Sequence, residues 1–223
     1  MRWSVRIGRL RIPGGVIVGF AVLVASSLFN FVTSELIQYL YPDRPVVPDL
    51  LFDLLPYVPQ AQYAFDTFVA ASIIAMLYYA FAVDRKRAGY YLFTVGIGYL
   101  ARAILMALTP LGQPVGNDET MGIGLLLNIY QHGMFPSGHT YLTAVIFFMI
   151  ERARAPRLKV ATGIFCAVEM VLLLLSHAHY SIDLVGGLMV AYLVNHWMVR
   201  HRDRFMDAAP KTAAARPPAP RRR

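Results

Sequence analysis

His179 and Asp183 lie four residues apart at the start of a long apolar segment, residues 182–199. If a helix begins near His179, these two positions share one face, and the Asp183 carboxylate can accept a hydrogen bond from one imidazole nitrogen. That bond would fix the tautomer and leave the other nitrogen free to attack an electrophile. The pair therefore predicts a nucleophilic histidine with its orienting acid. A polar pair satisfied by water is the alternative, and the two residues alone do not separate these interpretations.

The run Pro136-Ser137-Gly138-His139 opens another apolar segment. Ser137 is a suitable N-cap, and the free N–H groups of a helix N-terminus can bind a phosphate group. His139 would then lie in the first turn, where it could protonate a leaving oxygen. For this run taken by itself, an ordinary helix cap with an incidental histidine is the alternative.

Long apolar segments dominate the chain, with 57% hydrophobic and 15% charged residues, which is less charge than soluble domains carry. A membrane-spanning helix needs about 20 mostly apolar residues. We expect six spans, over residues 16–36, 62–83, 89–108, 137–150, 160–176 and 182–199. The predicted fold is an all-α integral membrane protein with one six-span domain, residues 1–204.

Two terminal segments need separate interpretation. The first apolar segment is longer than the 7–15 residues of a signal-peptide core, so we expect an uncleaved first span. Residues 205–223 consist mainly of Ala, Pro and Arg, a composition that cannot bury a core. They are predicted to form a disordered, basic cytoplasmic tail.

Lys and Arg residues concentrate in alternate connections between the spans. They occur before residue 12, in residues 84–88, in residues 151–159 and after residue 199, whereas the other connections hold only Arg44. The positive-inside rule places both termini in the cytoplasm. The net charge of +8 is therefore a topology signal, and we expect no nucleic-acid partner. On this topology His139 and His179 meet at the extracytoplasmic surface of a bacterial inner membrane.

Other polar residues near these motifs are candidates for substrate binding. Arg102 is the one Lys or Arg inside a predicted span, and a buried arginine is costly unless it has a polar partner. It is predicted to bind the substrate phosphate, with snorkelling to the head groups as the alternative. His132 lies in the second outer connection, either as a substrate contact or as a loop residue. Asp66 and Glu169 are acids inside spans, which could pair with Arg102, with a substrate cation or with an internal polar network.

The two histidine motifs resemble the signatures of the type 2 phosphatidic acid phosphatase superfamily. The chain is most similar to the sphingomyelin synthase branch, in Ser137-Gly138-His139-Thr140, in the run from Ser176 to Val185, and in Arg102 followed by Thr109-Pro110. The likeness covers about residues 90–200. It implies a phospho-histidine mechanism in which His179 attacks phosphorus, Asp183 orients it and His139 acts as acid and then base. No metal or other cofactor is expected.

The chain departs from the phosphatase branch at two cationic positions. That branch has Lys-x6-Arg-Pro, which here reads Arg102-x6-Thr109-Pro110, and it has an arginine at the position of Leu173. A phosphate monoester carries nearly two charges and a phosphodiester carries one. The loss of two cations therefore favours transfer of a phosphodiester head group over monoester hydrolysis.

Three functions follow from these observations. The first is a phosphotransferase that moves a phospho-head group from a glycerophospholipid to a lipid alcohol, either ceramide or diacylglycerol. The second is a phosphatase acting on a lipid phosphate or an isoprenyl pyrophosphate. The third is a non-catalytic membrane scaffold, against which the complete set of His139, His179 and Asp183 argues.

Overall fold

The computed structural model describes residues 4–7, 10–115 and 133–205, and helices make up most of this part of the chain. The helices are α1 (Gly14–Leu40), α2 (Leu50–Leu54), α3 (Gln62–Tyr78), α4 (Ala88–Leu108), α6 (Gly138–Met149), α7 (Pro156–Leu175) and α8 (Ser181–Val199). A π-helical turn, Tyr79–Val83, extends α3. Short 3₁₀ turns cover Pro59–Ala61, Arg85–Arg87 and Arg202–Phe205.

The N-terminal residues form a small antiparallel hairpin, which an all-α prediction did not include. Strands β1 (Ser4–Ile7) and β2 (Leu10–Pro13) pair so that Ser4 lies opposite Pro13 and Ile7 opposite Leu10. The all-α prediction therefore holds for most of the described residues but not for this segment, because a pair of four-residue strands is too short to leave a pattern like that of a long apolar helix.

Among the described residues, five helical segments are long and apolar enough to cross a membrane. They are Gly14–Leu40, Pro59–Val83, Arg85–Leu108, Pro156–Leu175 and Ser181–Val199. The protein is thus an integral membrane protein. The sixth predicted span corresponds to α6, which has only 12 residues. At 1.5 Å per residue α6 is about 18 Å long, shorter than the roughly 30 Å hydrocarbon core.

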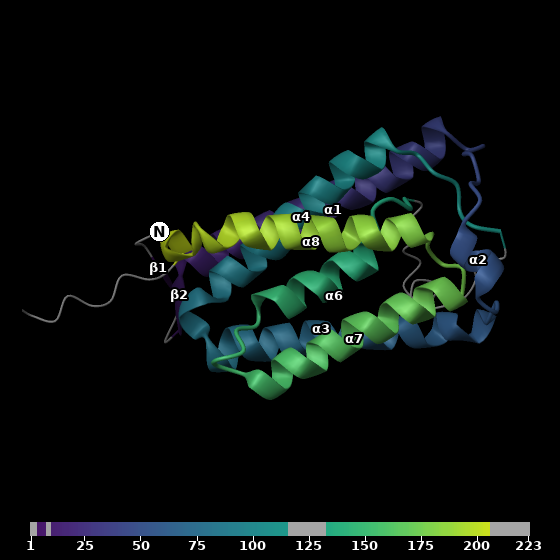
Figure 1. Cartoon of the computed structure of the whole chain (residues 1–223). Coiled ribbons are helices and arrows are strands. Elements are labelled where there is room, and N and C mark those ends of the chain that lie inside the picture. The colour runs from purple at the N-terminus through teal and green to yellow at the C-terminus, as the bar shows by residue number, and fades with distance from the viewer. Residues whose placement is uncertain (1–3, 8–9, 116–132, 206–223) are drawn as a thin grey trace, which may run out of the picture.

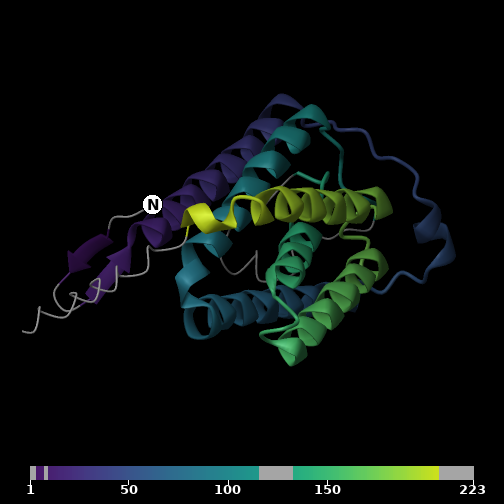
Figure 2. The same ribbon diagram turned by 60° about the vertical axis from the view of Figure 1, so that its left-hand side comes forward.

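The helices are arranged as neighbouring pairs around α6 (Figures 1 and 2). Helix α1 runs along α4, α3 runs along α7, and α6 packs between them against α8. Every residue of α6 is buried or half-buried. The main hydrophobic core is centred on this helix and includes Tyr91, Tyr141, Val145 and Ile146.

Close packing between α4 and its neighbours depends on glycine. A Cβ atom on Gly19 would collide with the backbone of Gly89, so α1 and α4 touch through their main chains. Helix α4 also contacts Tyr141 of α6, whose ring fills the space beside Gly98. The Tyr141 hydroxyl donates to the carbonyl oxygens of Thr94 and Val95, at 3.1 and 2.9 Å. These contacts fix the position of α6.

The two ends of the bundle differ in chemistry. At the end that carries β1 and β2, the Glu151 carboxylate accepts hydrogen bonds from Arg87, Arg154 and Arg202 at 2.7, 2.8 and 2.9 Å. The opposite end carries α2 (Figure 1) and the turn between α7 and α8. We call these the hairpin end and the α2 end. The basic connections described above lie at the hairpin end.

Candidate active site

His179 lies in the turn that joins α7 to α8 at the α2 end. Helix α7 ends at Leu175, and His177 adopts a positive φ of 53° that reverses the chain. The His179 side chain is almost fully buried, and its Nδ1 lies 3.2 Å from Oδ2 of Asp183. The same carboxylate oxygen accepts a hydrogen bond from the Tyr180 amide at 3.0 Å. Asp183 is thus held in the first turn of α8 and orients the imidazole, which leaves Nε2 for chemistry.

The surroundings of His179 favour its neutral form. Burial lowers the pKa of His179 below its ordinary value of 6.5, and the charges of His139 and Arg102 act in the same direction. The Asp183 carboxylate opposes this shift by hydrogen bonding and by its charge, but burial is the larger effect. A neutral imidazole has a lone pair on its free nitrogen, as a nucleophile requires.

His139 lies beside His179 in the first turn of α6. Ser137 caps this helix, since its Oγ accepts a hydrogen bond from the Thr140 amide at 3.3 Å. The centroids of the two histidine rings are 5.8 Å apart, with the rings inclined at 65°. Residues 40 positions apart in the sequence therefore meet at one site, as a two-histidine mechanism requires.

Two residues of α3 contact the His139 ring. Oδ1 of Asp66 lies 3.4 Å from His139 Nε2, and the ring of Phe65 packs edge-on against the imidazole at 5.1 Å between centroids. The sequence marked Asp66 as an acid inside a span but did not pair it with His139. Contacts between distant helices carry no local sequence signal, so this relationship required the structure.

Arg102 is almost completely buried, and its guanidinium group binds acceptors of the protein. Nε donates to the Pro136 carbonyl at 2.9 Å, one terminal nitrogen donates to the Gly133 carbonyl at 2.9 Å, and the other donates to Oδ1 of Asn30 at 2.7 Å. Gly138 leaves room for this group, because a Cβ atom there would lie 2.9 Å from Nε of Arg102. Arg102 thus holds the loop that precedes α6, a role that the sequence did not suggest.

Two further residues singled out in the sequence are His132 and Glu169. His132 lies outside the described residues. Glu169 of α7 is fully buried, with Oε2 3.3 Å from the Thr143 hydroxyl and Oε1 without a hydrogen-bond partner. Glu169 is within electrostatic range of His139 and Asp66.

Among the described residues, no group of three or more His, Cys, Asp or Glu side chains could hold a metal ion.

The segment around α2 covers the turn that carries His179. Asp49 caps α2 through the Leu51 amide at 2.9 Å and also accepts from the amide and hydroxyl of Ser181 at 2.5 and 3.0 Å. Phe52 stacks on the His177 ring with 4.0 Å between centroids. Sequence reasoning missed the contact of Asp49 with Ser181, because residues 132 positions apart share no local pattern.

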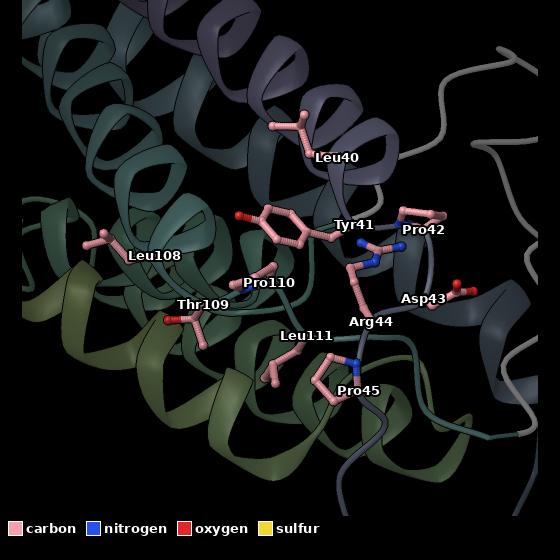
Figure 3. Close-up of a pocket in the computed structure, with 10 residues that line it drawn as sticks. All are labelled: Leu40, Tyr41, Pro42, Asp43, Arg44, Pro45, Leu108, Thr109, Pro110 and Leu111. Carbon is pink, nitrogen blue, oxygen red and sulfur yellow. The ribbon is translucent and has the colours of Figure 1, made fainter.

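A separate pocket opens at the α2 end between the ends of α1 and α4 (Figure 3). Its volume is about 500 Å³, and it is lined by residues 40–45 and 108–111. Thr109 and Pro110, which resemble part of a family motif, line this pocket, whereas His139, His179 and Asp183 do not. The pocket is therefore distinct from the histidine site.

The fold and site together define an integral membrane protein with a buried His–Asp pair facing a second histidine. Residues 134–201, which contain both histidines, match the family described as PAP2 superfamily C-terminal, and this match confirms the resemblance predicted from the motifs. The chain is also 25% identical over 208 residues to phosphatidylcholine:ceramide cholinephosphotransferase 1 of Caenorhabditis elegans. That alignment covers 78% of this chain and 44% of the relative, so the chain spans less than half of the relative's length.

Proposed function

We propose that the protein is a membrane phosphotransferase that moves a phospho-head group from a glycerophospholipid to a lipid alcohol, ceramide or diacylglycerol. The observation that carries this proposal is the 5.8 Å approach of the His139 and His179 rings, with Asp183 bound to His179. The similarity to a phosphatidylcholine:ceramide cholinephosphotransferase supports the same reaction class.

In the first half-reaction, Nε2 of His179 forms a bond to phosphorus while the bond from phosphorus to the glycerol oxygen breaks. The departing oxygen takes a proton from His139, which begins the step as an imidazolium. Asp183 accepts the Nδ1–H hydrogen bond of His179 and stabilises the positive charge that develops on the attacking ring. The products are diacylglycerol and a phospho-histidine.

In the second half-reaction, the acceptor alcohol gives its proton to His139, and its oxygen attacks phosphorus. The nitrogen–phosphorus bond then breaks, which regenerates neutral His179 and protonated His139. If water replaces the lipid alcohol, the same two steps hydrolyse the diester and release the head-group phosphate. With a phosphate monoester as substrate, attack by water releases free phosphate, which is the reaction of a phosphatase.

The cations around the site favour a phosphodiester substrate. The guanidinium of Arg102 is engaged by three protein acceptors. Leu173, at a position where the phosphatase branch has an arginine, is fully buried among Phe65, Ala178 and Leu184. A diester has a single negative charge, so it needs less cationic compensation than a monoester.

The orientation in the membrane belongs to the same proposal. The basic connections of the hairpin end would face the cytoplasm, by the positive-inside rule. The α2 end, with His139 and His179, would then face the extracytoplasmic side of a bacterial inner membrane. Phospholipid and lipid alcohol would reach the histidines from the outer leaflet.

The test uses the purified full chain in detergent micelles. Labelled phosphatidylcholine, phosphatidylethanolamine and phosphatidic acid are each supplied with and without ceramide, or a diacylglycerol whose acyl chains differ from those of the donor, so that either transfer product can be told from the donor. A labelled product that appears only with the lipid alcohol is the expected result, and His179→Ala should abolish it. Release of a free head-group phosphate without an acceptor would identify a phosphatase instead. Absence of any product with every lipid would reject the enzyme and favour a scaffold.

A further inference from the structure

Both histidines of the site have a carboxylate, but on different ring nitrogens. Asp183 lies 3.2 Å from Nδ1 of His179, whereas Asp66 lies 3.4 Å from Nε2 of His139. The first pair leaves Nε2 of His179 for chemistry, and the second leaves Nδ1 of His139. The nitrogen without a carboxylate is therefore Nε2 in His179 and Nδ1 in His139, and the centroids of the two rings are 5.8 Å apart.

Asp66 reaches the site from a part of the chain outside the matched C-terminal region. It lies in α3, whereas the family match begins at residue 134. The Asp66 side chain is 19% exposed and that of His139 is 36% exposed, so His139 is the more accessible member of the pair. An acid inside a membrane-spanning helix is costly unless a partner or a polar cavity compensates for it. The His139 ring, 3.4 Å away, is such a partner.

The helix that carries Asp66 also restrains the ring by packing. Phe65, the preceding residue, is almost buried and contacts the His139 ring edge-on with an interplanar angle of 81°. Phe65 in turn packs with Leu173, Ala178 and Leu184, which surround the His179 turn. Two consecutive residues of α3 thus fix the orientation of His139, one by charge and one by shape.

Among the described residues, three titratable side chains face His139, and they differ in the helix or turn that carries them and in their distance from the ring. Asp66 approaches from α3, Glu169 from α7 and His179 from the turn before α8. Glu169 is fully buried, and Oε2 lies against Thr143. Of the two carboxylates, Asp66 is the one within ion-pair distance of the His139 ring.

We propose that Asp66 is a positioning residue that binds Nε2 of His139 and stabilises its protonated form, so that Nδ1 delivers the proton to the departing alcohol. This inference rests on the proposed function. In the step concerned, the phosphorus–oxygen bond of the substrate breaks, the proton of Nδ1 moves to that oxygen, and the histidine becomes neutral. Asp66 does not touch the substrate, and its contribution is made through His139.

The test compares two phosphodiesters with different leaving groups. Phosphatidylcholine releases an alkoxide that needs a proton, whereas p-nitrophenyl phosphocholine releases a stable phenolate that does not. Release of the first alcohol is measured in single-turnover reactions, so the result does not depend on whether water or lipid resolves the intermediate. We expect Asp66→Asn to lower the single-turnover rate at saturating phosphatidylcholine by roughly 10–100-fold, with little change in the concentration that gives half of the maximal rate. The p-nitrophenyl substrate should lose less than about threefold.

Three control variants make the result specific. His139→Ala should show the same leaving-group dependence, with a larger loss on phosphatidylcholine of about 10²–10⁴-fold. Combining Asp66→Asn with His139→Ala should cause no further loss, since residues that act through each other are not additive. Ser72→Ala alters another buried polar residue of α3, about 9 Å further along the helix, and should leave both rates unchanged.

Other outcomes would overturn the inference. Equal losses on both substrates, or full activity on both, would each show that Asp66 does not act through proton transfer. If Asp66→Asn fails to fold, Asp66→Glu keeps the charge and should show a smaller loss confined to phosphatidylcholine. A similar loss on both substrates for Asp66→Glu would contradict the proposal. A wild-type protein that releases no alcohol from either diester would instead reject the proposed function itself.

Discussion

The backbone amide of Ser137 donates a hydrogen bond of 2.9 Å to the carbonyl oxygen of Asp183, which joins the loop before α6 directly to the first turn of α8. Ser137 precedes His139 by two residues, and Asp183 follows His179 by four. Asp183 therefore binds α6 through its carbonyl and His179 through its carboxylate. The distance between His139 and His179 therefore depends on this backbone contact between the loop before α6 and the first turn of α8.

Gly187 of α8 tests this dependence. A Cβ atom there would lie 2.8 Å from the Ser137 carbonyl oxygen and 3.0 Å from the Tyr141 amide, so Gly187→Ala should push α6 away from α8. We expect a fall in turnover of about 10–100-fold, because a displacement of about 1 Å can cost 10²-fold. Gly163→Ala in α7 is the control, since its Cβ would meet only the Phe147 ring. Equal activity of both variants and the wild type would contradict the argument.

The pH profile should report the neutral form of His179. Because burial lowers its pKa below 6.5, the acid limb of kcat/KM should lie below pH 6.5, and a separate fall at higher pH should report loss of the proton that His139 donates. Asp183→Asn removes the carboxylate that raises this pKa, so the acid limb should move to lower pH. The maximum of the profile should fall on the order of 10⁴-fold, as in an analogous triad that loses its acid. A wild-type acid limb above pH 6.5 would show that burial does not control the nucleophile, and a limb that moves to higher pH in Asp183→Asn would contradict the role of the Asp183 carboxylate.

Arg102→Ala should lower stability as well as activity. The change leaves three buried acceptors without their donor, namely Asn30 and the carbonyl oxygens of Gly133 and Pro136. Each unsatisfied buried group costs about 1–3 kcal/mol, so the Tm in detergent should fall clearly. Arg102→Lys should recover little, since one ammonium group cannot replace a planar fork.

Arg200→Ala provides the control for Arg102, because Arg200 is exposed at the hairpin end. Its Tm and turnover should match the wild type. An Arg102→Ala protein that is inactive yet as stable as the wild type would instead indicate direct binding of the substrate phosphate.

The orientation can be tested with single cysteines in a Cys166→Ala background. Val46→Cys at the α2 end should react with an impermeant maleimide in intact cells, and Ala153→Cys at the hairpin end should not. Both positions are exposed, so accessibility within the protein does not separate them. The reverse pattern would place the histidines on the cytoplasmic side and contradict the positive-inside argument.

The sequence predicted the features that repeat along the chain or lie close together in it. Apolar length located α3, α4, α7 and α8 to within a few residues. The four-residue spacing of His179 and Asp183 predicted their contact, because a helix start fixes that geometry. The approach of His139 to His179 followed from charge-based topology combined with two local motifs.

What the sequence did not predict depends on residues far apart in the chain. Asp49 lies 132 positions from Ser181, Asn30 lies 72 positions from Arg102, and Asp66 lies 73 positions from His139. No periodic pattern links such pairs. The charge of Arg102 is visible in the sequence and predicts a phosphate ligand, which stays a prediction, whereas its three protein acceptors became visible only in the structure.

The shortness of α6 has a consequence for how the bilayer acts on the protein. A helix of about 18 Å that is enclosed by other helices has no hydrophobic length to match to the surrounding lipid. The irregular segment before α6, residues 133–137, is buried or half-buried, as non-helical backbone at membrane depth requires. Thinning or thickening of the bilayer would therefore be absorbed by tilting of the outer helices. Among the described apolar helices, α6, which carries His139, is therefore the one least directly exposed to such strain.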